Sequence, residues 1–276
     1  MRENNPTPPQ NALSWKDMEK EWDKKALKIS KTYPLKTFKK LPKIPGITKD
    51  ALKNLRWNSL KYLITNDLNR KIRKGFMKRP LSYSYFLCKS FFRKKPFLRD
   101  DDFFLYGLNN IEEFKELLSQ KKHLLILGFS YCQKPLECPS GRFTEKCLRD
   151  LENPICQQCF IAKLIHLLPK NSIIPLFITT IHYIGEKVFE IIQKHKEKNI
   201  LFIITACELT LNMFGDLGNM VNIKGIGVKL EGRICNTIKA FELSEKGKKP
   251  GLTVVQEHTK QRIFNLIQYY YNLNSA

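Results

Sequence analysis

The sequence predicts an α/β protein with an open, mainly parallel sheet of about four strands and helices on both faces, preceded by a basic helical extension. Three observations lead to this prediction. Short apolar runs alternate with segments of helical periodicity in the second part of the chain. These runs lack the polar alternation of a half-exposed strand. The first hundred residues also carry a much larger positive charge than the rest.

Four apolar runs are the predicted strands, at residues 123–129, 172–178, 200–205 and 223–228. Nearly continuous apolar runs of this length are typical of strands covered on both faces. The helices that connect or follow them are predicted at residues 155–168, 183–195, 209–220 and 256–271. The first of these begins with a capping asparagine and a proline, and a further helix ends in FKELLSQ before the first strand.

The chain divides into two predicted parts, residues 1–100 and residues 101–276. The first part holds 26 Lys and Arg residues against 8 Asp and Glu residues, whereas the second holds 22 against 18. A field of this kind attracts nucleic acid, an anionic membrane surface or an acidic protein, and salt screens it. Residues 1–12 are rich in Asn and Pro, and we expect them to be disordered.

The basic extension is predicted to be helical after its first residues. A helix begins at the capping residue Ser14, with Asp17 completing a capping box, and a linker follows at residues 32–47. Residues 49–76 carry an apolar stripe of helical spacing and an opposite basic side. We expect this helix to dock on the main domain, although it could lie on a membrane or on nucleic acid. The run LSYSYFLCKSFF is expected to pack on the core and to bury Cys88.

The predicted location is the cytoplasm. The start of the chain has no apolar core of signal-peptide length, and no run reaches the roughly 18 apolar residues of a membrane span. We therefore expect no transmembrane segment. Structural disulfides are rare in a reducing compartment, so the eight cysteines are expected to bind metal or to react as thiols.

Seven cysteines form the candidate site, and five of them lie within 28 residues in the pattern C-x5-C-x8-C-x8-C-x2-C. In sequence order the seven are Cys132, Cys138, Cys147, Cys156, Cys159, Cys207 and Cys235. The first and the last two follow predicted parallel strands, so we expect these three to meet at one edge of the sheet. The C-x2-C pair lies in the first turns of a predicted helix, where the macrodipole favours thiolates.

An iron-sulfur cluster, of the 4Fe-4S type, is the predicted cofactor. Zinc is the alternative, but structural zinc sites usually combine two C-x2-C knuckles or add histidines, and this chain has a single knuckle. Seven ligands allow a division into four and three, with one iron of the second cluster open to substrate. A thioredoxin-like couple at the C-x2-C pair is less favoured because no strand directly precedes it.

Four other residues are candidates for a supporting role. Glu208, Asn236 and Thr237 adjoin cysteines, so they could orient a ligand or donate hydrogen bonds to sulfur, or act as ordinary turn and cap residues. His182 follows the second strand and could be a ligand or a surface residue. The G-x-G at residues 225–227 does not indicate a dinucleotide site, because no third glycine and helix follow. The sequence has no P-loop, C-x3-C-x2-C, G-x-S-x-G or HExxH motif.

These segments resemble a prokaryotic family, domain of unknown function 116, whose members share seven cysteines and are suspected iron-sulfur proteins. The resemblance spans residues 103–240 and rests on FFLYGLNN, LLILGFSYCQKPLECPS, ICQQC, ITACEL and GIGVKLEGRICNT. It implies that the seven cysteines above are the family's cysteines and leaves Cys88 outside. It implies no particular reaction and does not cover the basic extension.

The expected function is electron transfer, or redox or Lewis-acid catalysis on a small molecule at an open iron. The partner would be an unidentified electron donor or small-molecule substrate, with an anionic partner for residues 1–100. Two alternatives remain. One is a zinc-stabilised module that binds nucleic acid, and the other is a thiol-disulfide oxidoreductase that uses Cys156 and Cys159.

Overall fold

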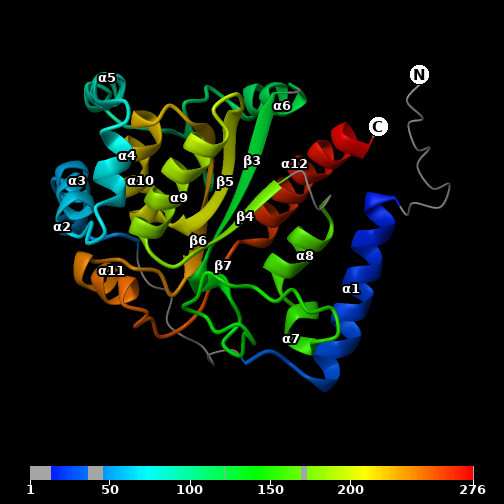
Figure 1. Ribbon diagram of the computed structural model, residues 1–276. Coiled ribbons are helices and arrows are strands. Elements are labelled where there is room, and N and C mark those ends of the chain that lie inside the picture. The colour runs from blue at the N-terminus through cyan, green and yellow to red at the C-terminus, as the bar shows by residue number, and fades with distance from the viewer. Residues whose placement is uncertain (1–13, 37–45, 121, 169–172, 276) are drawn as a thin grey trace, which may run out of the picture.

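The computed structural model describes residues 14–36, 46–120, 122–168 and 173–275. These residues form a mixed α/β structure in which helices flank a sheet of mostly parallel strands (Figure 1). The predicted fold class is therefore confirmed. The expected disorder of residues 1–12, and most of the predicted linker at residues 32–47, fall outside the described residues.

The sheet of the described residues has seven strands. They are β1 (Leu98–Asp100), β2 (Phe103–Tyr106), β3 (His123–Ser130), β4 (Ile173–Ile178), β5 (Asn199–Cys207), β6 (Lys224–Gly232) and β7 (Thr253–Val254). Their order is β1-β2-β6-β5-β3-β4, and β7 pairs with β6. The four predicted strands are β3 to β6, and they are parallel, whereas the three short strands that the sequence did not predict pair in antiparallel fashion.

The register of the parallel strands brings their carboxyl ends to one edge of the sheet. Ser130 at the end of β3 is paired with Ile178 at the end of β4, and Phe129 is paired with Thr205 of β5. Cys207, the last residue of β5, is paired with Leu230 of β6. Connections that leave these strands therefore start close together, which is where ligands bind in open α/β sheets.

Helices cover both faces of the sheet. The extension contributes α1 (Trp15–Thr32), α2 (Lys49–Leu52), α3 (Leu55–Thr65), α4 (Lys71–Phe76) and α5 (Pro80–Phe91). The remaining helices are α6 (Ile111–Ser119), α7 (Pro154–Gln157), α8 (Phe160–His166), α9 (Ile181–Lys194), α10 (Glu208–Met220), α11 (Ile238–Glu245) and α12 (Glu257–Ser275). Helices α2–α5, α9, α10 and α11 share one apolar core with the sheet, and α1, α6, α8 and α12 share the other (Figure 1).

The predicted helix at residues 49–76 is three helices, which corrects the sequence prediction. Asn54 and Arg70 both adopt left-handed backbone conformations, with φ of 54°, and each ends the helical path before α3 or α4 begins. Leu55, Leu63 and Ile72 are buried in the core shared with the sheet. The expected docking of this region on the main domain is therefore observed, although not as one continuous helix.

Helix α5 corrects a second expectation. Its residues Tyr83 and Ser90 are buried, as packing on the core requires. Cys88, however, is exposed rather than buried, because it lies on the opposite side of the helix. At the start of the chain, the cap of α1 is as predicted: the Asp17 N–H donates to the Ser14 hydroxyl over 3.3 Å. Among the described residues, no helix combines the length and apolar character needed to cross a bilayer.

Candidate metal centre

The seven candidate cysteines lie in two groups. Cys132, Cys207 and Cys235 are the three-cysteine group, defined by the cavity that all of them line. Cys138, Cys147, Cys156 and Cys159 are the four-cysteine group. Within it, negative charge on Cys138 raises the pKa of Cys147, and charge on these two raises the pKa values of Cys156 and Cys159. All seven are free thiols.

The three-cysteine group lies at the carboxyl ends of parallel strands, as the sequence predicted. Cys132 is in the short 3-10 helix η1 (Tyr131–Gln133) directly after β3. Cys207 ends β5 and precedes α10, and Cys235 lies in the loop between β6 and α11. All three are buried and line one cavity of about 40 Å³, which has room for a water molecule or two.

Hydrogen bonds connect the cysteines of this group to polar side chains. The thiol of Cys235 hydrogen-bonds to Cys207, which lowers the pKa of Cys207 and raises that of Cys235. The Lys249 ammonium donates to the Cys235 sulfur over 3.0 Å, and the Thr210 hydroxyl lies 3.1 Å from the Cys207 sulfur. The third member, Cys132, has its pKa raised by burial. The group therefore favours one thiolate even without metal.

The four-cysteine group is built by the loop after η1 and by the start of α7 and α8. The single helix predicted at residues 155–168 is broken, so that Cys156 lies in α7 and Cys159 caps α8. Burial is the main cause that raises the pKa of Cys156, and it raises that of Cys159 to about 12. Negative charge on Cys138 and Cys147 raises both pKa values further, and on this basis the four cysteines are grouped together.

Lys134 fastens the loop that carries Cys138 and Cys147. Its side chain is only 2% exposed, and its ammonium group donates to backbone carbonyls at 3.3 Å, 2.8 Å and 2.7 Å. These carbonyls belong to Gly141, Thr144 and Lys146. A buried ammonium needs such partners because an unpaired one would be costly. Lys134 therefore folds the loop around itself and fixes both cysteines.

Arg142 connects the two groups. Its guanidinium donates to the carbonyl oxygen of Cys132 at 3.2 Å and to that of Gly251 at 2.8 Å. The same residue belongs to the loop of the four-cysteine group. Arg142 therefore ties the loop of the four-cysteine group to the backbone of the three-cysteine group.

The sulfur spacing tests which metal the thiols fit. A tetrahedral zinc site with Zn–S bonds of about 2.3 Å brings its sulfurs to within about 4 Å of one another. Among the described residues, which include all eight cysteines, no three cysteine sulfurs lie within 4.8 Å of one another. In a cluster each thiolate binds a different iron, so its sulfurs stand farther apart. The purely thiol donor set suits an iron-sulfur cluster or zinc, and the spacing shows only that no three of the described sulfurs are arranged as in a tetrahedral zinc site.

The four other predicted residues have structural contacts of their own. Glu208 forms an ion pair with Arg99 at 2.6 Å, and Thr237 caps α11 by accepting from the Ala240 N–H. The backbone carbonyl of Asn236 accepts from Thr48 in the extension. His182 packs against α3, with its Nε2 atom 3.3 Å from the Leu63 carbonyl oxygen. None of these four lines the cavity of the three-cysteine group.

Sequence reasoning missed the polar residues of this cavity, among them Thr210, Glu245 and Lys249. Glu245 ends α11 and accepts from the Ile181 N–H at the start of α9, over 3.0 Å. Burial is the largest cause that raises its pKa to about 8. Thr210 is three residues from Cys207 and could have been found by its spacing. Glu245 and Lys249 lie in a polar segment of the sequence that contains no motif to indicate a place in the site.

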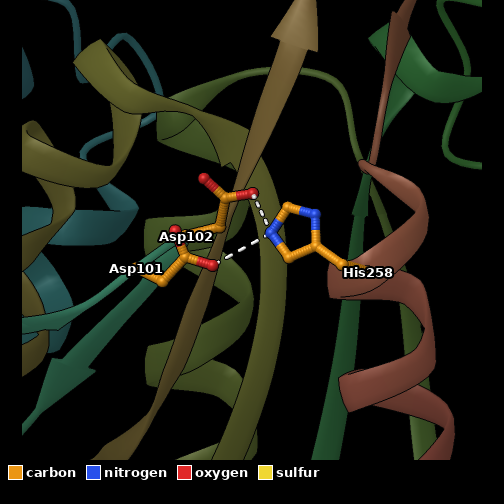
Figure 2. Close-up of side chains that lie close together, drawn as sticks. All are labelled: Asp101, Asp102 and His258. Carbon is orange, nitrogen blue, oxygen red and sulfur yellow. Dashed lines mark hydrogen bonds and ion pairs between the residues drawn. The ribbon is translucent and has the colours of Figure 1, made fainter.

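A separate cluster is formed by Asp101, Asp102 and His258 (Figure 2). The His258 Nε2 atom lies 2.9 Å from an Asp101 oxygen and 3.7 Å from an Asp102 oxygen. Thr259 donates to Asp102 over 2.7 Å, and Arg262 lies 3.7 Å from Asp101. Both carboxylates are therefore paired, and the cluster ties α12 to the turn between β1 and β2.

The fold and the two cysteine groups define a cysteine-rich α/β protein with a candidate metal centre at its strand ends. No family model matches the chain, and neither a curated protein nor a solved structure shows a significant match. The resemblance to domain of unknown function 116 therefore stays a prediction.

Proposed function

We propose that the chain is an iron-sulfur protein, in which the four-cysteine group and the three-cysteine group each hold one cluster. The observation that supports this most is the division of seven thiols into four and three at one edge of the sheet. Four thiolates provide one ligand for each iron of a 4Fe-4S cluster. Three thiolates leave one iron without a cysteine ligand, and a cluster at this group would have to widen the cavity of about 40 Å³ that the three thiols line.

The two groups would have different roles. A cluster with four cysteine ligands transfers electrons, and one with an open iron can also bind and activate a small molecule as a Lewis acid or redox centre. Lys249 and Thr210 contact sulfurs of the three-cysteine group, and such contacts tune the reduction potential. The same cavity contains Glu245, a carboxyl group that could hold a proton near a bound substrate.

Anaerobic purification with iron, acid-labile sulfide and zinc quantified tests this proposal. We expect iron and sulfide in nearly equal amounts, a brown protein with broad visible absorbance, and little zinc. Zinc in stoichiometric amount without iron or sulfide would overturn the proposal. It would support the zinc-stabilised, nucleic-acid-binding alternative, whose affinity for nucleic acid should then fall steeply with salt.

The thiol-disulfide alternative rests on Cys156 and Cys159. Burial raises the pKa of both thiols, which disfavours an attacking thiolate. This observation makes the alternative the weaker one. It predicts disulfide reduction by metal-free protein and loss of that activity in either Cys→Ser variant, and we expect neither result.

A further inference from the structure

Helix α5 has an exposed apolar stripe in addition to its buried face. Leu81, Tyr85, Cys88 and Phe92 are spaced at i, i+4, i+7 and i+11, which places them on one side of the helix. All four are exposed, and the exposed fractions of Leu81 and Phe92 reach 87% and 92%. The opposite side of α5 packs on α10. A helix that is apolar on both sides normally has a second apolar partner.

The neighbouring helices carry further exposed apolar side chains. Trp57 and Ile64 on α3, Leu68 after α3, and Met77 at the end of α4 are all exposed. Ile64 and Met77 also form part of the wall of a predominantly apolar cavity of about 410 Å³ between α3, α4, α5 and α10. Exposed apolar side chains therefore occur on three neighbouring helices, and two of these side chains line this cavity.

The same region is strongly basic. Residues 49–95 contain fourteen Lys and Arg residues and only two acidic residues. Among the described residues, only Arg56 and Lys71 of these fourteen have a carboxylate within 4.0 Å. The positive charge is therefore largely available to an external partner.

The helices that carry this surface are held firmly. Arg56 on α3 donates to both carboxylate oxygens of Asp216 on α10, at 2.8 Å and 2.6 Å. It also donates to the backbone carbonyls of Ser90 and Arg93 at the end of α5. The surface is therefore a fixed feature of the fold.

The combination of exposed aliphatic side chains and positive charge selects the partner. A second copy of this chain would bring two strongly basic surfaces together, which is repulsive. Nucleic acid would satisfy the charge, but Leu68, Leu81 and Met77 cannot stack on bases. An anionic bilayer satisfies both, because apolar side chains enter the acyl boundary while Lys and Arg meet the headgroups. We propose that α3–α5 form a docking surface for an anionic lipid bilayer, with the stripe of α5 inserted.

Vesicle co-sedimentation of the full chain tests the proposal. We expect binding to phosphatidylcholine vesicles that contain phosphatidylglycerol, weaker binding at high salt, and at least about tenfold weaker binding to phosphatidylcholine alone. Absence of binding to anionic vesicles would overturn the proposal. So would tight binding to duplex DNA or RNA together with equal, weak partition to both kinds of vesicle.

Two pairs of variants identify the surface. Leu81→Ser with Phe92→Ser should weaken vesicle partition at least about tenfold. The matched control, Leu27→Ser with Leu273→Ser, changes exposed leucines on α1 and α12 and should leave partition unchanged. Lys94→Gln with Lys95→Gln should weaken partition at least about tenfold, whereas Lys24→Gln with Lys28→Gln on α1 should not. Equal effects of test and control variants would contradict the assignment.

Trp57 provides a second measurement that does not depend on these variants. It is exposed, whereas Trp15 and Trp22 are buried. Docking should shift the tryptophan emission to shorter wavelength, and brominated lipids should quench it. Trp57→Phe should abolish the shift while partition continues. Vesicle binding with no shift in the wild-type protein would place the contact elsewhere and overturn the proposal.

Discussion

The Nζ atom of Lys249 lies 3.0 Å from the Sγ atom of Cys235, which places a positive charge beside thiols that come from three different strand ends. Burial lowers the pKa of Lys249, but the charge interactions with Cys132, Cys235 and Cys207 and the hydrogen bond to Cys235 raise it, so that the net shift is upward. Lys249 is therefore charged throughout the physiological range. It balances negative charge in an otherwise buried site.

Replacing Lys249 should change the electronic properties of this site. Lys249→Met removes a positive charge next to a cluster ligand, so we expect the reduction potential of the cluster at the three-cysteine group to fall. Lys249→Arg keeps the charge and should restore most of the potential. A redox titration followed by electron paramagnetic resonance measures both. Equal potentials in wild type and Lys249→Met would contradict the assignment of this group as a cluster site.

Lys134→Met should release the loop of the four-cysteine group. The substitution removes three hydrogen bonds to backbone carbonyls and leaves these carbonyls without the ammonium, which should cost about 2–4 kcal/mol of unfolding free energy. Urea denaturation measures the loss. Lys146→Met in the same loop is the control, since that side chain is exposed. Similar stability of the two variants would show that Lys134 does not hold the loop.

Glu245 should make the stability of the protein depend on pH. Burial raises the pKa of this carboxyl to about 8, above its usual value of 4.5. Between these two pH values the folded protein retains a proton that the unfolded chain releases. The contribution of Glu245 to the free energy of unfolding should therefore be highest below pH 4.5 and should fall as the pH rises towards 8.

Glu245→Gln isolates this contribution. The amide is a permanent mimic of the protonated carboxyl, so the difference in stability between variant and wild type should grow in favour of the variant from pH 5 to pH 8.5. Urea midpoints at several pH values measure this difference. If the difference were constant over the range, Glu245 would have an ordinary pKa and would be a poor candidate for holding a proton at the site.

Gly225 is required by packing within the sheet. A Cβ atom at this position would lie 2.2 Å from the backbone oxygen of Phe202 on the neighbouring strand. Gly225→Ala should therefore lower the unfolding free energy by roughly 3 kcal/mol or more, because a backbone atom cannot move aside. Gly46→Ala meets no atom within 4 Å and should be close to neutral. Thermal unfolding of both variants distinguishes packing from a ligand-binding role for the G-x-G pair.

The sequence predicted the parallel sheet because its strands are buried on both faces and therefore consist almost wholly of apolar residues. It did not predict that the helix is interrupted at Asn54 and Arg70. Residues other than glycine adopt the left-handed backbone conformation too rarely for the sequence to predict where they do so. The exposure of Cys88 was also missed. A helix with apolar residues on both sides does not reveal which side is buried.

Only part of the arrangement of the cysteines could be predicted from the sequence. The carboxyl ends of parallel strands lie at one edge of a sheet, so residues that follow these strands come close together. This rule predicted that Cys132, Cys207 and Cys235 would meet. Cys132 and Cys138 are only six residues apart, yet they belong to different groups because Lys134 folds the intervening loop. Contacts made by a single buried side chain of this kind depend on tertiary structure and have no local pattern.

The iron content of Cys→Ser variants, purified without oxygen, tests the central claim most directly. Two 4Fe-4S clusters correspond to about eight irons per chain. We expect Cys159→Ser and Cys235→Ser each to lose about half of the iron and the double variant to lose nearly all of it. Cys88→Ser, which changes the exposed cysteine outside both groups, should keep it. Iron that is absent from the wild type, or that is unaffected by both single substitutions, would contradict the account.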